Sequence, residues 1–365
     1  MAATTSTAAT PSTFDIVAAR FPLVPRSRPS CPPLDARIAH VAALAGQAAG
    51  GGGDALLRAA EAHNLAALIA SDCGLPDLAR SLCWRQIDTL PLRRPLDGAT
   101  AKLALQPFIN LARLRLRAGD GLAAYQMLTT LYDVVVARTS TAIDERALVF
   151  DDLVTDVDHP QTVRWLWTVL LADGTRALTR TGHWTEALDH LNRHKGIGQR
   201  LLDGRQTAIL AHHAHRDHYA AEHLLTTTAT TQPWEQSVAT CLGLLHRHLT
   251  GLKTPDDGRS TIDALLPSNN PEHLTFNIQL GLCLLDLADT PQHLRPVLDT
   301  IIDGALHSDD AYAARDLLTH PAARGYLNRD QLTLLNERQR HSGLGSGRIP
   351  EALRTRLLGA LALAS

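Results

Sequence analysis

The sequence predicts an all-α protein, an α-solenoid of antiparallel helix pairs with a C-terminal capping helix. Hydrophobic residues make up 45% of the 365 residues and aromatic residues only 4%, so the apolar content is mostly alanine and leucine, which are strong helix formers. These apolar residues recur at the spacing of an amphipathic helix. Breaks at Gly182, Asp217, Gly251 and Asp289 lie 35, 34 and 38 residues apart, a near-constant interval that is typical of stacked helix pairs.

Residues 1–53 are predicted to form a flexible N-terminal segment with one short helix at 34–49. Glycines at 50–53 form a flexible break, and prolines interrupt the lead-in at positions 22, 25, 29, 32 and 33. Apolar residues leave a second arrangement open, in which this segment docks on the body or on a partner: Phe14, Ile16, Val17, Phe21 and Val24.

A regular helix–turn–helix pattern begins at Asp54, a favourable N-cap for a helix over 55–72. Gly74 ends that helix, and Pro76 opens a second one that runs to Leu90 and stops at Pro91. The same unit recurs over ranges that follow in order: 99–118 with 122–137, 162–181 with a helix opening at 183, 199–216 with 219–227, then 233–250 and 271–288. Shorter helices are expected at 310–319, 329–340 and 350–362.

These units resemble tetratricopeptide repeats (TPRs), in which the second helix opens with a glycine and has an alanine five residues later. The matching pairs are Gly74/Ala79, Gly119/Ala124 and Gly182/Ala187, while Arg216/Ala221 keeps only the alanine, and Pro91 and Pro233 stand near repeat ends. Two later units depart from the pattern, with Pro255 and His293 at the alanine position. The resemblance implies TPR-like repeats over 54–305, followed by a C-terminal helical cap over 306–365 that covers the open end of the array.

One long insertion, residues 138–161, interrupts the predicted array. It is acidic, with Asp144, Glu145, Asp151, Asp152, Asp156 and Asp158, and it carries a short apolar run at 147–150. We expect a solvated loop or a small β-hairpin there. The alternative is a functional loop, because long loops in compact proteins often carry function.

Charge and composition narrow the choice of partner. The formal net charge is −2, so the chain lacks the excess of basic residues that is typical of nucleic-acid-binding proteins. No apolar run approaches the length of a membrane span. Residues 1–13 lack the basic and apolar regions of a secretory signal. Five scattered cysteines without a CxxC motif indicate a reducing compartment. We therefore expect a cytoplasmic protein with no direct nucleic-acid or membrane partner, and the three lysines against 32 arginines favour an actinobacterial origin.

Two clusters represent the alternative function, an accessory biosynthetic or metal-dependent enzyme. The histidine-rich corner at 212–223 offers His215, His218 and Glu222, which would need to converge across a turn to bind zinc, and acidic residues at 144–159 offer oxygen ligands for a hard cation. Neither cluster has the spacing of a known metal motif, and no phosphate-binding loop or nucleophile elbow occurs. We therefore expect no enzyme activity, no metal and no cofactor.

The predicted function is that of a protein- or peptide-binding scaffold or regulatory protein that uses the concave face of the array. The resemblance to TPRs also implies which residues line the groove. Counting back from each break to the groove positions of the family gives a set of polar residues: Asn64, Arg113, Arg117, Arg176, Arg180, Gln206 and His213. The arginines at 113/117 and 176/180 share a helix face through their i, i+4 spacing. Guanidinium groups bind carboxylates and phosphates bidentately, so such a face suits an anionic segment. The competing interpretation is that these arginines are solvated or pair with Asp120 and Asp173.

Overall fold

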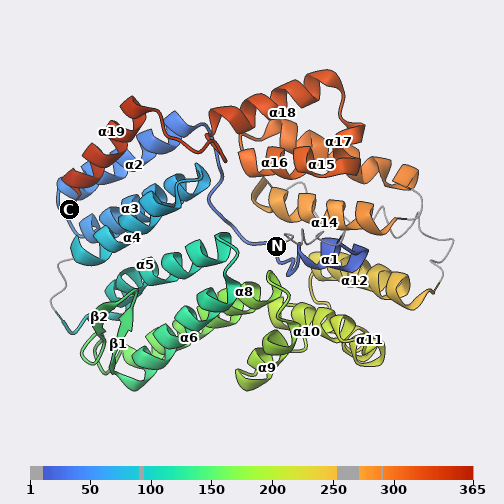
Figure 1. Cartoon of the computed structure of the whole chain (residues 1–365), viewed down its shortest axis with the longest axis horizontal. Coiled ribbons are helices and arrows are strands. Elements are labelled where there is room, and N and C mark those ends of the chain that lie inside the picture. Colours follow the sequence, from blue (N-terminus) through green and yellow to red (C-terminus); the bar gives the residue numbers. More distant parts are fainter. Residues whose placement is uncertain (1–10, 90–93, 253–270, 289–290, 365) are drawn as a thin grey trace, which may run out of the picture.

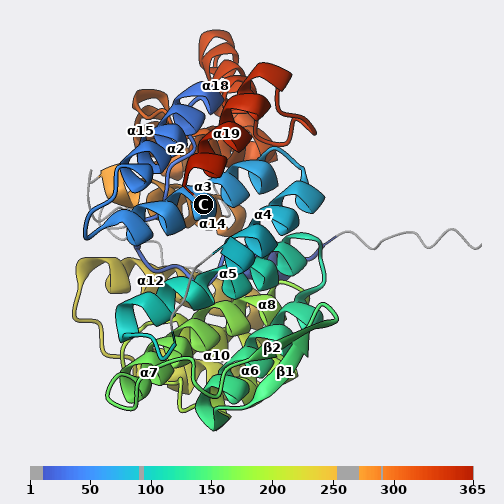
Figure 2. The same cartoon turned by 90° about the vertical axis from the view of Figure 1, so that its left-hand side faces the viewer.

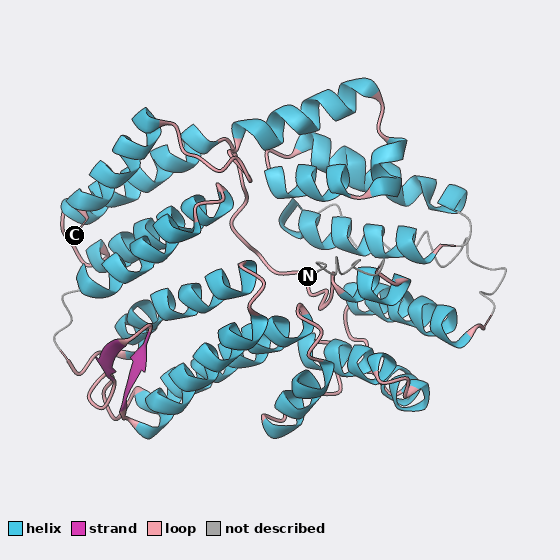
Figure 3. Cartoon of the chain, viewed as in Figure 1, coloured by secondary structure: helices cyan, strands magenta, loops and turns pink. Residues whose placement is uncertain are grey.

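The computed structural model describes residues 11–89, 94–252, 271–288 and 291–364. Within them, strands are limited to a hairpin of β1 (Ser140–Ile143) and β2 (Arg146–Val149), and almost all other regular structure is helical (Figure 3). The predicted all-α class is confirmed, whereas the assignment to a TPR-like solenoid stays a prediction. No helix of the described residues is long and apolar enough to cross a membrane.

The first part of the chain contains α1 (Thr13–Ala18), α2 (Leu34–Ala49), α3 (Ala55–Asp72), α4 (Pro76–Thr89), α5 (Gly98–Arg117), α6 (Gly121–Ala137) and α7 (His159–Val169). The bounds of α2–α6 are close to the predicted ones. The helix predicted over 162–181 is interrupted by a π-helical turn, η1 (Leu170–Gly174), after which α8 (Thr175–Thr179) continues it. Helix α1 has no counterpart among the predicted elements.

The second part of the chain is also helical. It contains α9 (Trp184–Arg193), α10 (Asp203–Ala214), α11 (His218–Thr226), α12 (Pro233–Thr250), η2 (Pro271–His273), α14 (Leu274–Leu287), η3 (Pro291–Leu294), α15 (Arg295–His307), α16 (Ala311–Thr319), α17 (Pro321–Tyr326), α18 (Arg329–His341) and α19 (Glu351–Leu363). Helix α17 was not expected. The predicted helix end at Leu90 and Pro91, the break at Asp289 and the repeat position at Pro255 lie outside the described residues.

Glycines end several helices in the conformation that the sequence predicts. Gly74, Gly119, Gly182 and Gly251 have φ angles of +77°, +86°, +78° and +70°, a left-handed conformation that glycine adopts without a steric penalty. Arg216 occupies the equivalent turn between α10 and α11 with φ +60°. The turn is therefore kept where the glycine is lost.

Helices neighbouring in sequence pack against one another and are arranged around a common centre (Figure 1). Their buried residues form two hydrophobic cores. The N-terminal core joins α2–α7 to α19. The C-terminal core joins α10–α12 and α14–α18 to α1 and the residues that follow it. Each end of the chain therefore packs on the opposite half of the molecule.

The N-terminal segment lies in the middle of this arrangement (Figure 1). Val17, Phe21 and Leu23 are at most 4% exposed and belong to the C-terminal core. Of the two arrangements that the sequence left open, residues 11–33 adopt the docked one, and the expected flexible segment is not found there. The physical reason is that its apolar residues find a surface formed by α10, α12 and α14, which are distant in sequence.

Helix α19 packs on α2 and α3 instead of extending the last helices (Figure 2). Backbone hydrogen bonds fix this connection, because the amides of Gly345 and Gly347 donate to the carbonyls of Asp72 and Cys73 at 2.7 and 2.8 Å. The predicted cap of residues 306–365 is thus divided: α16–α18 belong to the C-terminal core, and α19 covers the beginning of the array.

Candidate functional site

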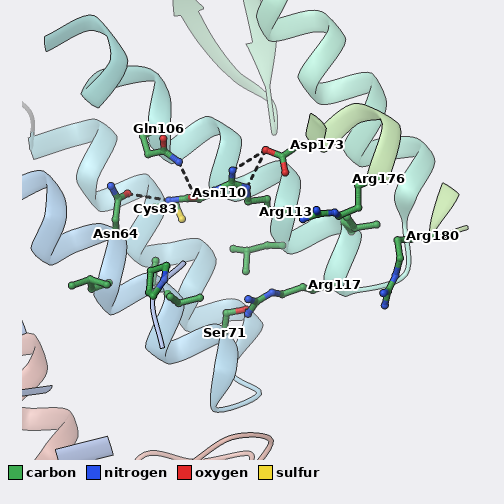
Figure 4. Close-up of a pocket in the computed structure, with 16 residues that line it drawn as sticks. Asn64, Ser71, Cys83, Gln106, Asn110, Arg113, Arg117, Asp173, Arg176 and Arg180 are labelled. Carbon is green, nitrogen blue, oxygen red and sulfur yellow. Dashed lines mark hydrogen bonds and ion pairs between the residues drawn. The ribbon is translucent and has the colours of Figure 1, made fainter. Parts of the chain in front are cut away.

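A cavity of about 610 Å³ opens toward the centre of the molecule between α3, α5 and α8 (Figure 4). Five of the seven predicted groove residues line it: Asn64, Arg113, Arg117, Arg176 and Arg180. Leucines and alanines of α3 and α5 form its apolar surface, with Pro29 of the N-terminal segment beside them. The volume falls within the range of ligand-binding pockets in proteins.

Helix periodicity explains how α5 builds one wall. Gln106, Asn110, Arg113 and Arg117 follow one another at spacings of four, three and four residues, which places them on one face of a helix. The amides are joined to α3 because Asn110 donates to Asn64 at 3.0 Å, and Gln106 donates to Asn110 at 3.2 Å. This wall is therefore a hydrogen-bonded row of amides that leads into the arginines.

The opposite wall comes from η1 and α8. Asp173 lies in the π-helical turn, and Arg176 and Arg180 follow it on α8 and at its end. Such turns insert one additional residue into a helix and often occur at functional sites. Here the turn presents an acid and two arginines to the same cavity (Figure 4).

The four arginines differ in their neutralisation. Arg113 pairs with Asp173 at 2.8 Å, whereas Arg117 binds Asp72 at 3.1 Å and the Ser71 hydroxyl at 2.6 Å. Arg176 and Arg180 form no ion pair with any described residue, which distinguishes them from the other two. The predicted alternative of pairing within the protein therefore holds for Arg113 with Asp173, while Asp120 instead caps α6 through the amide of Ala123.

Arg180 carries a charge that its surroundings stabilise poorly. Its Nη1 donates to the carbonyl of Ala19 at 3.1 Å, which satisfies a hydrogen bond without supplying a negative charge. Burial, and then the positive charges of Arg176 and Arg315, lower the pKa of Arg180, with Asp316 acting in the opposite direction. An anion placed at this end of the cavity would relieve that repulsion.

The two remaining predicted groove residues do not reach the cavity. Gln206 is fully buried, with Oε1 accepting from the Leu23 amide at 2.7 Å and Nε2 donating to the Leu23 carbonyl at 2.9 Å. His213 is 4% exposed and packs between His218 and His246, with 3.0 Å between its Nδ1 and that of His218. Gln206 does contact an extended peptide, but it is the chain's own N-terminal segment.

The histidine-rich corner does not bring the expected ligands together. His215 Nε2 is 2.9 Å from the Thr185 hydroxyl, and His218 is engaged with His213. Among the residues that the structure describes, no group of three or more histidine, cysteine or acidic side chains is arranged to hold a metal ion.

The acidic insertion forms the hairpin of β1 and β2, which is one of its two expected structures. Three of its carboxylates, those of Asp144, Asp152 and Asp156, pair with arginines. Asp144 in the hairpin turn binds Arg80 at 2.9 Å and Arg115 at 2.5 Å. Asp152 and Asp156 likewise pair with Arg94 and Arg138 at 3.2 and 2.6 Å. The hairpin is thus attached to α4 and α5 by charge, which gives its acidic residues a structural role.

Several residues that line the cavity were not predicted as groove residues, among them Gln106, Asn110 and Pro29. Gln106 and Asn110 had a readable signal, since they continue the arginine stripe of α5. Pro29 had none, because its place depends on the path of the N-terminal segment through the centre.

Comparison with protein-family models, with curated proteins and with solved structures finds no match to this chain.

Proposed function

We propose that this protein is a non-enzymatic scaffold or regulatory protein of TPR-like architecture, and that its central cavity binds an acidic peptide segment of a protein partner. The observation that carries the proposal is the charge imbalance of the cavity. Four arginines line it against one aspartate, and two of those arginines have no acidic partner among the described residues.

Arginine geometry supports a carboxylate as the preferred anion. A guanidinium offers a planar fork of donors that matches a carboxylate, and hydrogen bonds to charged groups contribute about 1.5–3 kcal/mol each. Arg176 and Arg180 lie one helical turn apart at the same end of the cavity (Figure 4). They are therefore placed to hold one or two carboxylates of a ligand.

The rest of the cavity supports a peptide as the bearer of that carboxylate. Leu65, Leu68 and Leu114 provide an apolar surface between the arginines and the amide row of Asn64 and Asn110. Amide side chains offer both a donor and an acceptor, which is what an extended peptide backbone requires. Gln206 shows this pairing inside the same molecule, since it accepts from and donates to the backbone of Leu23.

Fluorescence anisotropy with a labelled hexapeptide of alternating leucine and glutamate tests the proposal. We expect the wild-type protein to bind it at least about 10-fold more tightly than a leucine–glutamine hexapeptide, because one charge-assisted contact accounts for such a factor. The double variant Arg176→Glu/Arg180→Glu should lose this preference, and its affinity for the glutamate peptide should no longer fall as the salt concentration is raised.

The matched control is Arg354→Glu/Arg356→Glu, which makes the same change in net charge on the exposed side of α19. It should bind the glutamate peptide as the wild type does. Equal binding of both peptides by the wild type, or equal loss in the control, would refute the cavity as the acidic-peptide site.

A further inference from the structure

The N-terminal strap, defined as residues 19–31, crosses the centre of the molecule and touches the cavity at two points. Pro29 is part of the cavity lining, and the carbonyl of Ala19 accepts the hydrogen bond from Arg180. Arg180 also lines the cavity. A segment that the sequence presents as a lead-in is thus in contact with the group proposed to bind the ligand.

Apolar burial attaches the strap firmly to the C-terminal core. Phe21 and Leu23 are 3% and 4% exposed, and Cys31 at the other end is fully buried. Burying a leucine or phenylalanine side chain contributes about 1.5–3 kcal/mol relative to exposure. A ligand that displaced the strap would have to replace these contacts, so displacement is strongly unfavourable.

Polar contacts fix the register of the strap. Gln206 holds both backbone groups of Leu23, and the Cys31 amide donates to the Asp310 carboxylate at 2.9 Å. On the N-terminal side of Leu23, Arg20 pairs with Asp286 at 2.8 Å. The strap is therefore held by its backbone as well as its side chains, and the Ala19 carbonyl has a defined position beside Arg180.

The charge of the strap indicates whether the strap is a wall of the cavity or an internal competitor of the ligand. Its charged residues are all arginines, Arg20, Arg26 and Arg28, and each is paired with an aspartate of the body. An internal competitor for an arginine-lined cavity would carry acidic residues. The strap has no acidic residue, so it does not imitate the proposed ligand.

We infer that the strap is a fixed wall of the ligand site and that it positions Arg180 for anion binding. This inference rests on the proposed acidic-peptide function. Without the Ala19 carbonyl, the long Arg180 side chain is free to leave the cavity, and ordering it again costs about 0.5–1.5 kcal/mol when the ligand binds. Gln206, which holds the strap but does not line the cavity, is accordingly a positioning residue.

Gln206→Leu tests the inference, because it keeps the side-chain volume approximately and removes the hydrogen bonds to Leu23. Hydrogen exchange of the Leu23 amide, which donates to Gln206, should accelerate by about 10-fold or more. Affinity for the leucine–glutamate hexapeptide should fall by about 2- to 10-fold, which is the cost of ordering one side chain. Affinity for the leucine–glutamine peptide should stay unchanged, so the ratio between the two peptides falls, a change that general destabilisation would not produce.

Gln86→Leu is the matched control, since Gln86 is a glutamine of α4 that is only 1% exposed and is not among the residues that hold the strap through the hydrogen bonds described above. It should leave both strap exchange and peptide preference as in the wild type. If Gln206→Leu does not fold, Arg26→Ala replaces it, because Arg26 is half-exposed and pairs with Asp203 of α10. Its effects should have the same direction and a smaller size.

The outcomes separate the two proposals. A wild-type protein that does not prefer the glutamate peptide refutes the proposed function itself. A wild type that prefers it, combined with a loosened strap and an unchanged preference in Gln206→Leu, overturns the positioning role. Tighter binding by Gln206→Leu would also overturn it, because it would identify the strap as a competitor.

Discussion

The surface that faces the centre of the molecule has two halves, one around α3, α5 and α8 and one around α10. Both halves contain predicted groove residues, but these residues differ in what covers them. Around α3, α5 and α8 the predicted residues line an open cavity. Around α10 the equivalent residues Gln206 and His213 are buried, one by the strap and the other by neighbouring histidines. The same counting rule thus selects inward-facing positions in both halves. The accessibility of Gln206 depends on a segment far away in sequence, whereas that of His213 depends on neighbouring histidines.

The largest expected effect on the free energy of unfolding comes from a buried contact that connects the two halves. Asp72 of α3 accepts hydrogen bonds from Arg37 at 2.5 Å, from Arg117 at 3.1 Å and from the hydroxyl of Tyr312 on α16 at 2.6 Å. Asp72→Asn should lower the free energy of unfolding by about 3 kcal/mol, because it leaves the Arg37 guanidinium buried without a counter-charge. Urea denaturation measures this change.

Asp299→Asn is the control, since Asp299 forms an exposed pair with Arg295 on α15. It should change the free energy of unfolding by less than about 0.5 kcal/mol. Similar losses in the two variants would mean that the buried contact does not join the halves.

Two buried histidines, His190 and His213, should have an intermediate effect on stability. They can serve as probes, one in each half. Burial, followed by the charge of His194, lowers the pKa of His190 to about 4. Burial, followed by the charges of His246, His218 and His212, lowers that of His213 to about 4. The ordinary value in an unfolded chain is about 6.5, so the folded state favours the neutral form. The stability contributed by these residues is complete above pH of about 6.5 and is lost as the pH falls toward about 4.

We expect each histidine to contribute on the order of 2 kcal/mol to the loss of stability across that window. Urea denaturation at several pH values should show a flatter pH dependence for His190→Gln and for His213→Gln than for the wild type. The control His307→Gln removes an exposed histidine paired with Asp303 and should keep the wild-type slope. A slope unchanged by either buried variant would contradict the prediction.

The smallest expected effects on stability come from two arginines of the cavity, Arg113 and Arg176. They show which arginine contributes to stability and which is available for binding. Arg113→Gln breaks the half-exposed pair with Asp173 and should cost about 0.5–1 kcal/mol. Arg176→Gln breaks no ion pair and reduces repulsion on Arg180, so stability should change by less than about 0.5 kcal/mol. Thermal unfolding at low and high ionic strength measures both, and salt should reduce the cost of Arg113→Gln. A larger loss from Arg176→Gln would show that this arginine is structural.

Local signals predicted the helices well. The apolar spacing predicted α2 and α3 to the residue, although Asp54, the predicted N-cap of α3, makes no side-chain capping hydrogen bond. Glycines marked turns that the backbone adopts in the left-handed conformation. The π-helical turn was not predictable, because Leu170–Gly174 has the composition of an ordinary helix. The docking of α1 was only one of two predicted arrangements, since its burial depends on partners far away in sequence, such as Trp184 and helix α14.

The sequence by itself determined the helical class, the positions of the turns and the side chains that face inward, because helix periodicity and capping act over a few residues. Only the tertiary structure decided which inward arginines are neutralised, where the strap lies and which half of the inner surface stays open. Those properties depend on contacts such as Arg117 with Asp72 and Gln206 with Leu23, which join residues that no local pattern connects.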